Sequence, residues 1–183
     1  MVNGSSNEGH CMGLGLEGGT VRLVPYNPEW VCFFEEEKAR LLASVGPFVL
    51  EIQHVGSTSI PGMAAKPILD IAIAIKNYEE ASVCIQPIVE LGYEYKGELG
   101  IPRRHYFVKG DPRTHHIHMN EIGSQDWIDQ IEFRDYLTRH PETAQEYVDL
   151  KLALAGRFPM DRQAYLEGKA PFIQKVLRMA RAE

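Results

Sequence analysis

Residues 54–75 read HVGSTSIPGMAAKPILDIAIAI, and they are the most informative part of the sequence for the fold. The small and hydroxyl-bearing residues GSTSIPG, at positions 56–62, separate two apolar segments at 49–55 and 68–75. Short apolar segments bounded by glycine and proline are typical of buried strands. Asp70 is the only charged residue in the second segment. The stretch therefore predicts two strands joined by a polar turn, with one carboxylate in the middle of the second strand.

Outward from this stretch, helix and turn signals alternate with apolar segments. The tripeptide Asn27-Pro28-Glu29 is typical of a helix start, since asparagine caps a helix and proline suits its first position; this helix is expected to run to about Val45. We therefore expect an α+β fold, with a mixed β-sheet, flanking helices and a C-terminal group of helices. In chain order, the other expected elements are a helix over 78–91, strands over 93–96, 104–109 and 115–120, and helices over 124–139, 141–155 and 161–181.

The length and composition of the chain indicate one domain. A chain of 183 residues, 44% of them hydrophobic, can bury the core of one domain of ordinary size. Residues 1–20 contain six glycines, no aromatic residue and no lysine or arginine, which is unlike a signal peptide. We expect a flexible tail over residues 1–20 and a single domain over residues 21–183.

Charge and cysteine content exclude several classes of protein. The formal net charge of −6 argues against an extended nucleic-acid-binding surface. Cys11, Cys32 and Cys84 lie far apart without a Cys-x-x-Cys pair, so we expect neither a disulfide framework nor a zinc finger, and a cytoplasmic location fits. No apolar run approaches the roughly 18 residues of a membrane-spanning helix, so no membrane association is expected.

Charge is distributed unevenly along the chain. Residues 96–118 hold five basic and two acidic residues, and residues 151–183 hold seven basic and three acidic residues. Between them, residues 121–150 hold two basic and eight acidic residues. These segments are either ordinary solvated helix faces, or two basic segments that frame a cleft for a polyphosphate.

The turn segment contains three consecutive hydroxyl residues, Ser57, Thr58 and Ser59, directly after Gly56. Backbone N–H groups and hydroxyls in such a turn can hold phosphate oxygens, because glycine permits close approach. The spacing is neither that of a Walker A loop nor that of a Gly-x-Gly-x-x-Gly motif. The segment is interpreted either as a phosphate-binding turn or as a tight structural turn.

Asp70 indicates a functional site more strongly than the turn does, because burying an isolated carboxylate costs free energy unless it has a partner. One interpretation is a structural ion pair with Lys66 or an arginine. The other is contact with a metal ion or a substrate in a cleft.

A third candidate is the histidine-rich segment HHIHMN at residues 115–120. On a strand, His116, His118 and Asn120 share one face. Two imidazoles at this spacing, together with the carboxylate of Asp70, would form a two-histidine, one-carboxylate metal site. Alternatively, these histidines are ordinary polar residues or hydrogen-bond a phosphate or a substrate amide.

Basic residues near these motifs are candidates for phosphate contacts. Alternation along the strand places Arg103 and Arg104 on opposite faces, and one of them is expected to reach a phosphate if the strand end is not simply solvated. In the last helix, Lys169 lies one turn after Tyr165 and is either a cleft residue or an ordinary exposed lysine.

Taken together, these motifs resemble a known family. The segments PYNPEW, HVGSTSIPGMAAKPILDI, HHIHM, EFRDYLTRHPETAQEYVDLK and YLEGKAPFI resemble the GrpB-like family over residues 21–180. That family is similar to a branch of the nucleotidyltransferase superfamily of the polymerase β type, in which a Gly-Ser pair follows one strand and an Asp-x-Asp/Glu motif lies on the next. The matching positions here are Gly56, Ser57 and Asp70.

The resemblance implies binding of a nucleoside triphosphate through the Gly-Ser turn, with carboxylates that hold two Mg²⁺ ions. This sequence departs from that pattern, since Ala72 stands at the second carboxylate position. Magnesium needs several oxygen ligands, which Asp70 alone does not supply. Glu51 and Glu121 are further candidate ligands.

Three hypotheses about function follow. The first is a nucleotidyltransferase-like enzyme that binds a nucleotide and Mg²⁺ at Asp70. The second is a hydrolase-like enzyme with one Zn²⁺, Mn²⁺ or Fe²⁺ ion at Asp70, His116 and His118. The third is a non-catalytic module for a nucleotide or another anionic small molecule. In the first hypothesis the phosphate contacts are Gly56, Ser57, Thr58, Ser59, Lys66, Arg103, Arg104 and Lys169.

Overall fold

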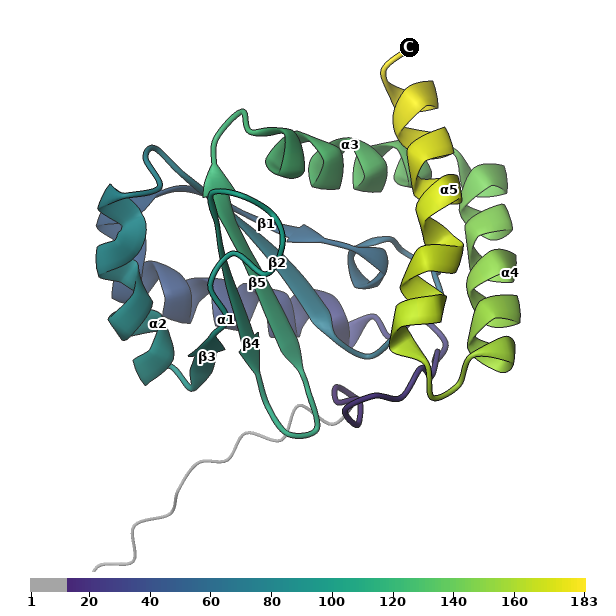
Figure 1. Ribbon diagram of the computed structural model, residues 1–183, viewed down its shortest axis with the longest axis horizontal. Helices are drawn as coiled ribbons and strands as arrows, with labels where there is room; N and C mark the ends of the chain where they lie inside the picture. The colour runs from purple at the N-terminus through teal and green to yellow at the C-terminus, as the bar shows by residue number, and fades with distance from the viewer. Residues whose placement is uncertain (1–12) are drawn as a thin grey trace, which may run out of the picture.

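Five strands form one mixed sheet in the order β1-β2-β5-β4-β3 (Figure 1). The computed structural model describes residues 13–183. β2 and β5 are parallel, whereas the other neighbouring pairs are antiparallel. This arrangement confirms the expected α+β fold. The strands are β1 (Val49–Val55), β2 (Leu69–Ile75), β3 (Tyr93–Tyr95), β4 (Arg104–Lys109) and β5 (His115–Glu121).

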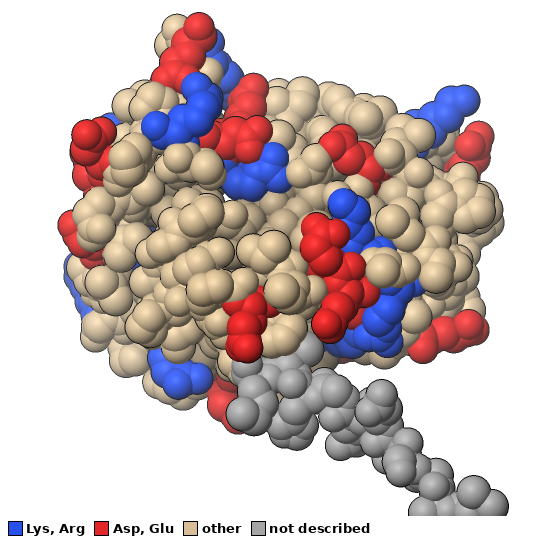
Figure 2. Space-filling model, turned by 180° about the vertical axis from the view of Figure 1, so that it is seen from behind, with Lys and Arg blue, Asp and Glu red and all other residues tan. Residues whose placement is uncertain are grey.

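Helices cover both faces of the sheet. On one face lie α1 (Glu29–Val45) and α2 (Ile85–Glu90), and toward the other face lie the C-terminal helices α3 (Gln125–Arg139), α4 (Pro141–Arg157) and α5 (Arg162–Ala180) (Figure 1). Viewed from behind, the surface carries acidic and basic side chains interspersed among neutral ones (Figure 2).

Alternation along β2 separates the two faces. Leu69, Ile71 and Ile73 are buried in the main hydrophobic core with residues of α1. Ala72, on the opposite face, packs instead with Trp127 of α3. Asp70 belongs to this second face, so the carboxylate points toward the C-terminal helices rather than into the main core.

The ends of two long helices follow the capping signals in the sequence. Oδ1 of Asn27 accepts a hydrogen bond of 3.0 Å from the backbone N–H of Glu29, where α1 begins. Oδ1 of Asp161 accepts one of 3.0 Å from the N–H of Ala164, in the first turn of α5. These side chains satisfy N–H groups that have no partner inside a helix.

The single helix predicted over residues 78–91 was wrong. The segment forms a 3₁₀ helix over Glu80–Cys84, which passes directly into the short α2. Pro87 explains the difference, because proline has no N–H to donate and its ring clashes with the carbonyl of the residue four positions earlier.

The start of the described chain packs on the domain. Leu16 is buried and pairs with Arg113 through an isolated antiparallel bridge. Residues 1–12, which belong to the tail expected from the sequence, lie outside the described residues, and so does Cys11. Cys32 and Cys84 are both free thiols. Within residues 13–183, no helix has the length and apolar character to cross a membrane.

Candidate functional site

A cavity of about 500 Å³ lies on the second face of the sheet. Its walls come from the ends of β1 and β2, from β4 and β5, and from the three C-terminal helices. Of the residues singled out from the sequence, those that line it are Gly56, Ser57, Thr58, Lys66, Asp70, Arg104, His116, His118 and Lys169.

Asp70, His116 and His118 meet in this cavity because β2 and β5 are adjacent and parallel. In their register Asp70 lies opposite His116, and Ala72 lies opposite His118. Oδ1 of Asp70 is 2.9 Å from Nδ1 of His116 and 3.6 Å from Nε2 of His118. One ligand atom from each of the three residues lies within 4.8 Å of the others, which is a spacing suited to one metal ion.

The protonation states of this trio favour metal binding. Burial raises the pKa of Asp70, but hydrogen bonds from His116 and His118 outweigh it and hold that pKa well below its usual value. Burial lowers the pKa of His116 below its ordinary value, which favours the neutral imidazole. Nε2 of His116 is buried without a hydrogen-bond partner in the described part of the chain. A carboxylate and two imidazoles, one with an unused nitrogen, fit Zn²⁺, Mn²⁺ or Fe²⁺.

The turn after β1 approaches the Asp70 carboxylate closely. Gly56 has a φ of 69°, in the left-handed region that favours glycine. A Cβ atom at this position would lie 2.6 Å from Oδ2 of Asp70. Because Gly56 has no side chain, the Asp70 carboxylate can occupy this space.

The three hydroxyls of the turn have different surroundings. Oγ of Ser57 lies 3.0 Å from Nζ of Lys151. Thr58 is buried, with Oγ1 3.0 Å from Nε2 of His54. Ser59 does not line the cavity, because its hydroxyl donates a hydrogen bond of 2.6 Å to the carbonyl of Gly56. Ser57 is thus the hydroxyl with a basic partner in the cavity.

Lysine side chains gather beside the turn. Nζ of Lys66 and Nζ of Lys169 lie 5.6 and 4.7 Å from the centroid of the Tyr165 ring. Burial and the nearby charge of Lys66 together lower the pKa of Lys169 to about 7. Burial and the charges of Lys169 and Lys66 likewise lower the pKa of Lys151 to about 7. An anion beside Lys66 and Lys169 would stabilise the charged forms of these two lysines.

Lys151 and Arg162 also line the cavity, and the sequence analysis missed both. Lys151 had a detectable signal, because it lies four residues after Tyr147 and shares its buried helix face. A lysine in the apolar stripe of an amphipathic helix is unusual, since buried lysines generally need a partner. Arg162 begins α5 and carried no comparable signal.

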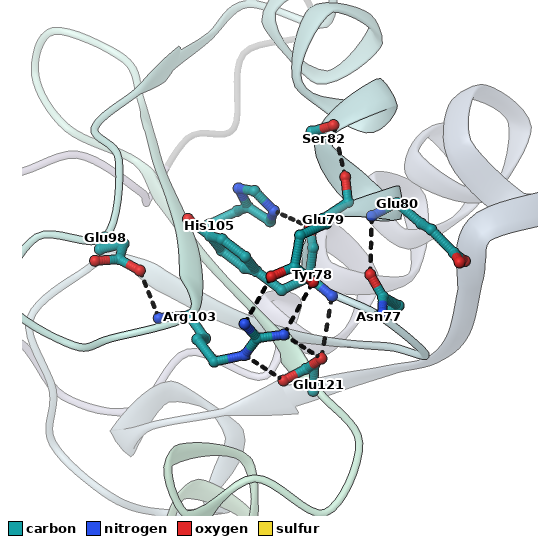
Figure 3. A network of polar contacts seen from close by, with 9 residues as sticks. All are labelled: Asn77, Tyr78, Glu79, Glu80, Ser82, Glu98, Arg103, His105 and Glu121. Carbon is teal, nitrogen blue, oxygen red and sulfur yellow. Dashed lines mark hydrogen bonds and ion pairs between the residues drawn. The ribbon is translucent and has the colours of Figure 1, made fainter.

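Arg103 precedes β4 and has a positive φ of 61°, so the strand alternation expected for it does not apply, but the two arginines do lie in different surroundings. Arg104 lines the cavity, with Nη1 3.4 Å from Nδ1 of His118. Arg103 lies outside the cavity, where Glu79 and Glu121 hold its guanidinium through ion pairs of 2.7 and 2.8 Å (Figure 3). Glu121 belongs to this network rather than to the Asp70 site, and Arg103 lowers the pKa of Glu121 to about 2.

The second carboxylate position of the nucleotidyltransferase motif is closed. Ala72 has 0% of its surface exposed and packs with Val55 and Trp127. A carboxylate at this position would be buried against an indole ring, which is costly. The site therefore offers one carboxylate and two imidazoles instead of a set of carboxylates.

The sheet, the Gly-Ser turn and the C-terminal helices together define a nucleotidyltransferase-like fold. A solved structure of Cid1 poly(U) polymerase with bound MgGTP superposes with a TM-score of 0.52, at 14% identity. The superposition covers 73% of this chain and 44% of the polymerase chain. At this identity the likeness concerns the fold alone.

The chain belongs to the GrpB family, whose model matches residues 20–179. The crystal structure of the conserved protein GrpB from Enterococcus faecalis is 36% identical, with a TM-score of 0.82, and covers 87% of this chain and 96% of that one. UPF0157 protein YqkA from Bacillus subtilis is 44% identical over 155 residues, which are 84% of this chain. The match spans 45% of the length of YqkA, so the Bacillus protein is about twice as long as the shared region.

Proposed function

We propose that this protein binds one divalent transition-metal ion at Asp70, His116 and His118, and a nucleotide or another phosphate-bearing ligand in the adjoining cavity, where it catalyses a metal-assisted reaction at phosphorus. The convergence of three ligand atoms within 4.8 Å carries the proposal. The cavity beside them is large enough for a small-molecule ligand.

The donor set supports a single transition-metal ion over a pair of Mg²⁺ ions. Magnesium prefers oxygen ligands in octahedral geometry, whereas two of the three donors here are imidazole nitrogens. Ala72 supplies no ligand, and Trp127 closes the space beside it. Among the hypotheses from sequence, the geometry therefore favours the transition-metal site, combined with a phosphate ligand.

The charge of the cavity supports an anionic ligand. Lys66, Lys169 and Arg104 line it, and Asp126 and Asp129 are further charged residues of the lining. Among the described residues, none of these three cations forms an ion pair with a carboxylate. A phosphate group would give these cations a negative partner. The MgGTP bound to Cid1 makes nucleotides the first ligands to test.

The roles of the residues follow from their positions. Asp70, His116 and His118 would hold the ion, which would act as a Lewis acid on a phosphoryl oxygen. Lys66 and Lys169 would neutralise and orient the phosphate oxygens, because their amino groups lie 5.6 and 4.7 Å from the centroid of the same Tyr165 ring.

The metal content of untagged protein, purified without chelator, tests the proposal. We expect about one transition-metal ion per chain in the native protein and its loss in His118→Ala. His140→Ala is the matched control, since His140 lies at the surface and pairs with Glu183. Calorimetric titration with pyrophosphate and with ATP then measures ligand binding. Metal content that is equal in both variants, or protein without metal before and after Zn²⁺ or Mn²⁺ addition, would contradict the metal site.

Binding without turnover would support the non-catalytic module instead. In that case the metal-loaded protein would bind ATP or pyrophosphate saturably, and phosphate release from either compound would stay at the level of the His118→Ala variant.

A further inference from the structure

Lys151 is an inward-pointing lysine without a carboxylate partner among the described residues. Its side chain is 1% exposed, and its Nζ lies 4.7 Å from the centroid of the Tyr147 ring. Its two polar contacts are the carbonyl oxygen of Ala64, at 2.6 Å, and Oγ of Ser57, at 3.0 Å. A buried ammonium normally needs a negative partner, and within residues 13–183 none lies in ion-pair distance of Lys151.

The surroundings of Lys151 favour its uncharged form. Burial is the main cause, and the charges of Lys169 and Lys66 add to it, so the pKa of Lys151 falls to about 7. An uncharged amine has two N–H groups and one lone pair. It can donate one hydrogen bond to the carbonyl of Ala64 and use the lone pair to accept the hydroxyl proton of Ser57. This is the arrangement of a serine that is activated by a neighbouring base.

Ser57 is placed where an activated hydroxyl can meet a phosphate ligand. It follows Gly56, whose backbone approaches Asp70, and it lines the same cavity as Lys66 and Lys169. Thr58 also lines the cavity, but it is 1% exposed and its hydroxyl contacts His54, which is not part of the lining. Ser57 is the less buried of the two, and its hydroxyl contacts Lys151, a base that itself lines the cavity.

We propose that Ser57 is a nucleophile and Lys151 its general base, so that the phosphoryl reaction passes through a covalent phosphoserine. Oγ of Ser57 attacks phosphorus, the bond from phosphorus to the leaving oxygen breaks, and the hydroxyl proton passes to Nζ of Lys151. Lys151 then returns this proton to the leaving oxygen. In a second step the oxygen of water or of an acceptor hydroxyl attacks phosphorus and gives its proton to Nζ of Lys151. The bond from phosphorus to Oγ of Ser57 breaks, and Lys151 passes the proton to Oγ, which regenerates Ser57. The inference rests on the proposed function for its phosphate ligand.

A fluorophosphonate probe tests the nucleophile without knowledge of the substrate. Such a probe transfers its phosphonyl group to an activated serine and releases fluoride. We expect a single adduct on the full-length protein, located at Ser57 by peptide mass spectrometry and absent from Ser57→Ala. Lys151→Met should slow labelling by at least about 100-fold, which is the usual contribution of a general base. Lys175→Met is the lysine control, because Lys175 pairs with Glu146 at the surface, and it should label at the native rate.

A second variant covers the case in which Lys151→Met does not fold. In Ser57→Cys, the base should activate the introduced thiol, so iodoacetamide should alkylate it at least tenfold faster at pH 7 than the exposed, free Cys32 in the same chain. No adduct at Ser57, equal labelling of Lys151→Met and native protein, or a thiol at position 57 slower than Cys32 would overturn the inference. Metal content and pyrophosphate binding, measured on the same native sample, show separately whether the proposed function itself fails.

Discussion

Gly56 and Asp70 are in such close contact that the site depends on the absence of a side chain at position 56. A Cβ added to Gly56 would lie 2.6 Å from Oδ2 and 3.1 Å from Cβ of Asp70. The glycine also holds a left-handed φ of 69°. The turn and the carboxylate therefore pack directly against each other.

Gly56→Ala is expected to displace the Asp70 carboxylate and abolish metal retention. It should also lower the free energy of unfolding by about 1–3 kcal/mol through backbone strain. Gly62→Ala is the matched control, because Gly62 also has a positive φ but would place its Cβ in open space. Urea unfolding and metal content separate the two effects. If both variants retain metal equally, the contact between positions 56 and 70 does not organise the site.

Glu37 should matter for stability rather than for ligand binding. It is buried on the far side of the sheet, where it accepts hydrogen bonds of 2.8 Å from Tyr93 and 2.7 Å from Lys109. Glu37→Gln should lower the free energy of unfolding by about 3 kcal/mol, since it leaves the Lys109 charge without its partner. Glu35→Gln, at an exposed position of the same helix, is the control and should cost little.

The pH dependence of the free energy of unfolding should reflect the ionisation of Glu37. Burial raises the pKa of Glu37, but the contacts with Lys109 and Tyr93 outweigh it and hold the folded-state pKa below its ordinary value of 4.5. Its contribution to stability is therefore present above the unfolded-state pKa and is lost as the pH falls through the folded-state pKa. The stability difference between native protein and Glu37→Gln should shrink as the pH falls from neutral to below 4.5. A constant difference over this range would mean that Glu37 is not ionised in the fold.

Anion binding should weaken as the pH rises through neutrality. The pKa values of Lys151 and Lys169 are lowered to about 7, so both are charged in acid and uncharged in alkali. Sulfate is a suitable probe because its charge is constant over this range. Its affinity should fall about tenfold between pH 6 and pH 8 if binding requires one of these lysines to be protonated. Calorimetry in buffers of different ionisation enthalpy should show proton uptake at pH 8, and Lys169→Arg should reduce that uptake. Affinity that is the same at both pH values would count against lysine contacts to the anion.

Arg104 and Arg103 form a natural pair of test positions. Arg104→Ala should weaken pyrophosphate binding at least tenfold, because the guanidinium lines the cavity. Arg103→Ala should change the affinity less than twofold, since this side chain is 49% exposed and held by Glu79 and Glu121 (Figure 3). The reverse order of effects would place the phosphate site on the other side of the sheet.

Much of the fold and part of the site could be predicted from the sequence, because both depend on local patterns. The isolated carboxylate of Asp70 and the spacing of His116 and His118 were visible as strand alternation. The pairing of β2 with β5 was not visible, because it joins residues 46 positions apart, such as Asp70 and His116. The meeting of Asp70 with the two histidines depends on the sheet order β1-β2-β5-β4-β3, which the structure supplies.

Two other features depended on tertiary packing. Lys151 was not singled out from the sequence, although its spacing from Tyr147 was visible, and the packing of α4 against the Gly56–Ser57 turn shows what it contacts. Arg103 looked equivalent to Arg104, and only the position of Glu79 and Glu121 shows which of them is held away from the cavity.

The packing of Trp127 over Ala72 also bears on how this site could change by mutation. Ala72→Asp alone would restore the spacing of a two-carboxylate motif but would bury the new charge against the indole. A smaller residue at position 127 alone would open a cavity in the core and gain no ligand. Each single change is expected to lower the stability of the fold without adding a usable metal ligand, so both changes are needed together before a second metal ion could be held. A designer who wishes to cross it should introduce both changes in one library rather than select them one at a time.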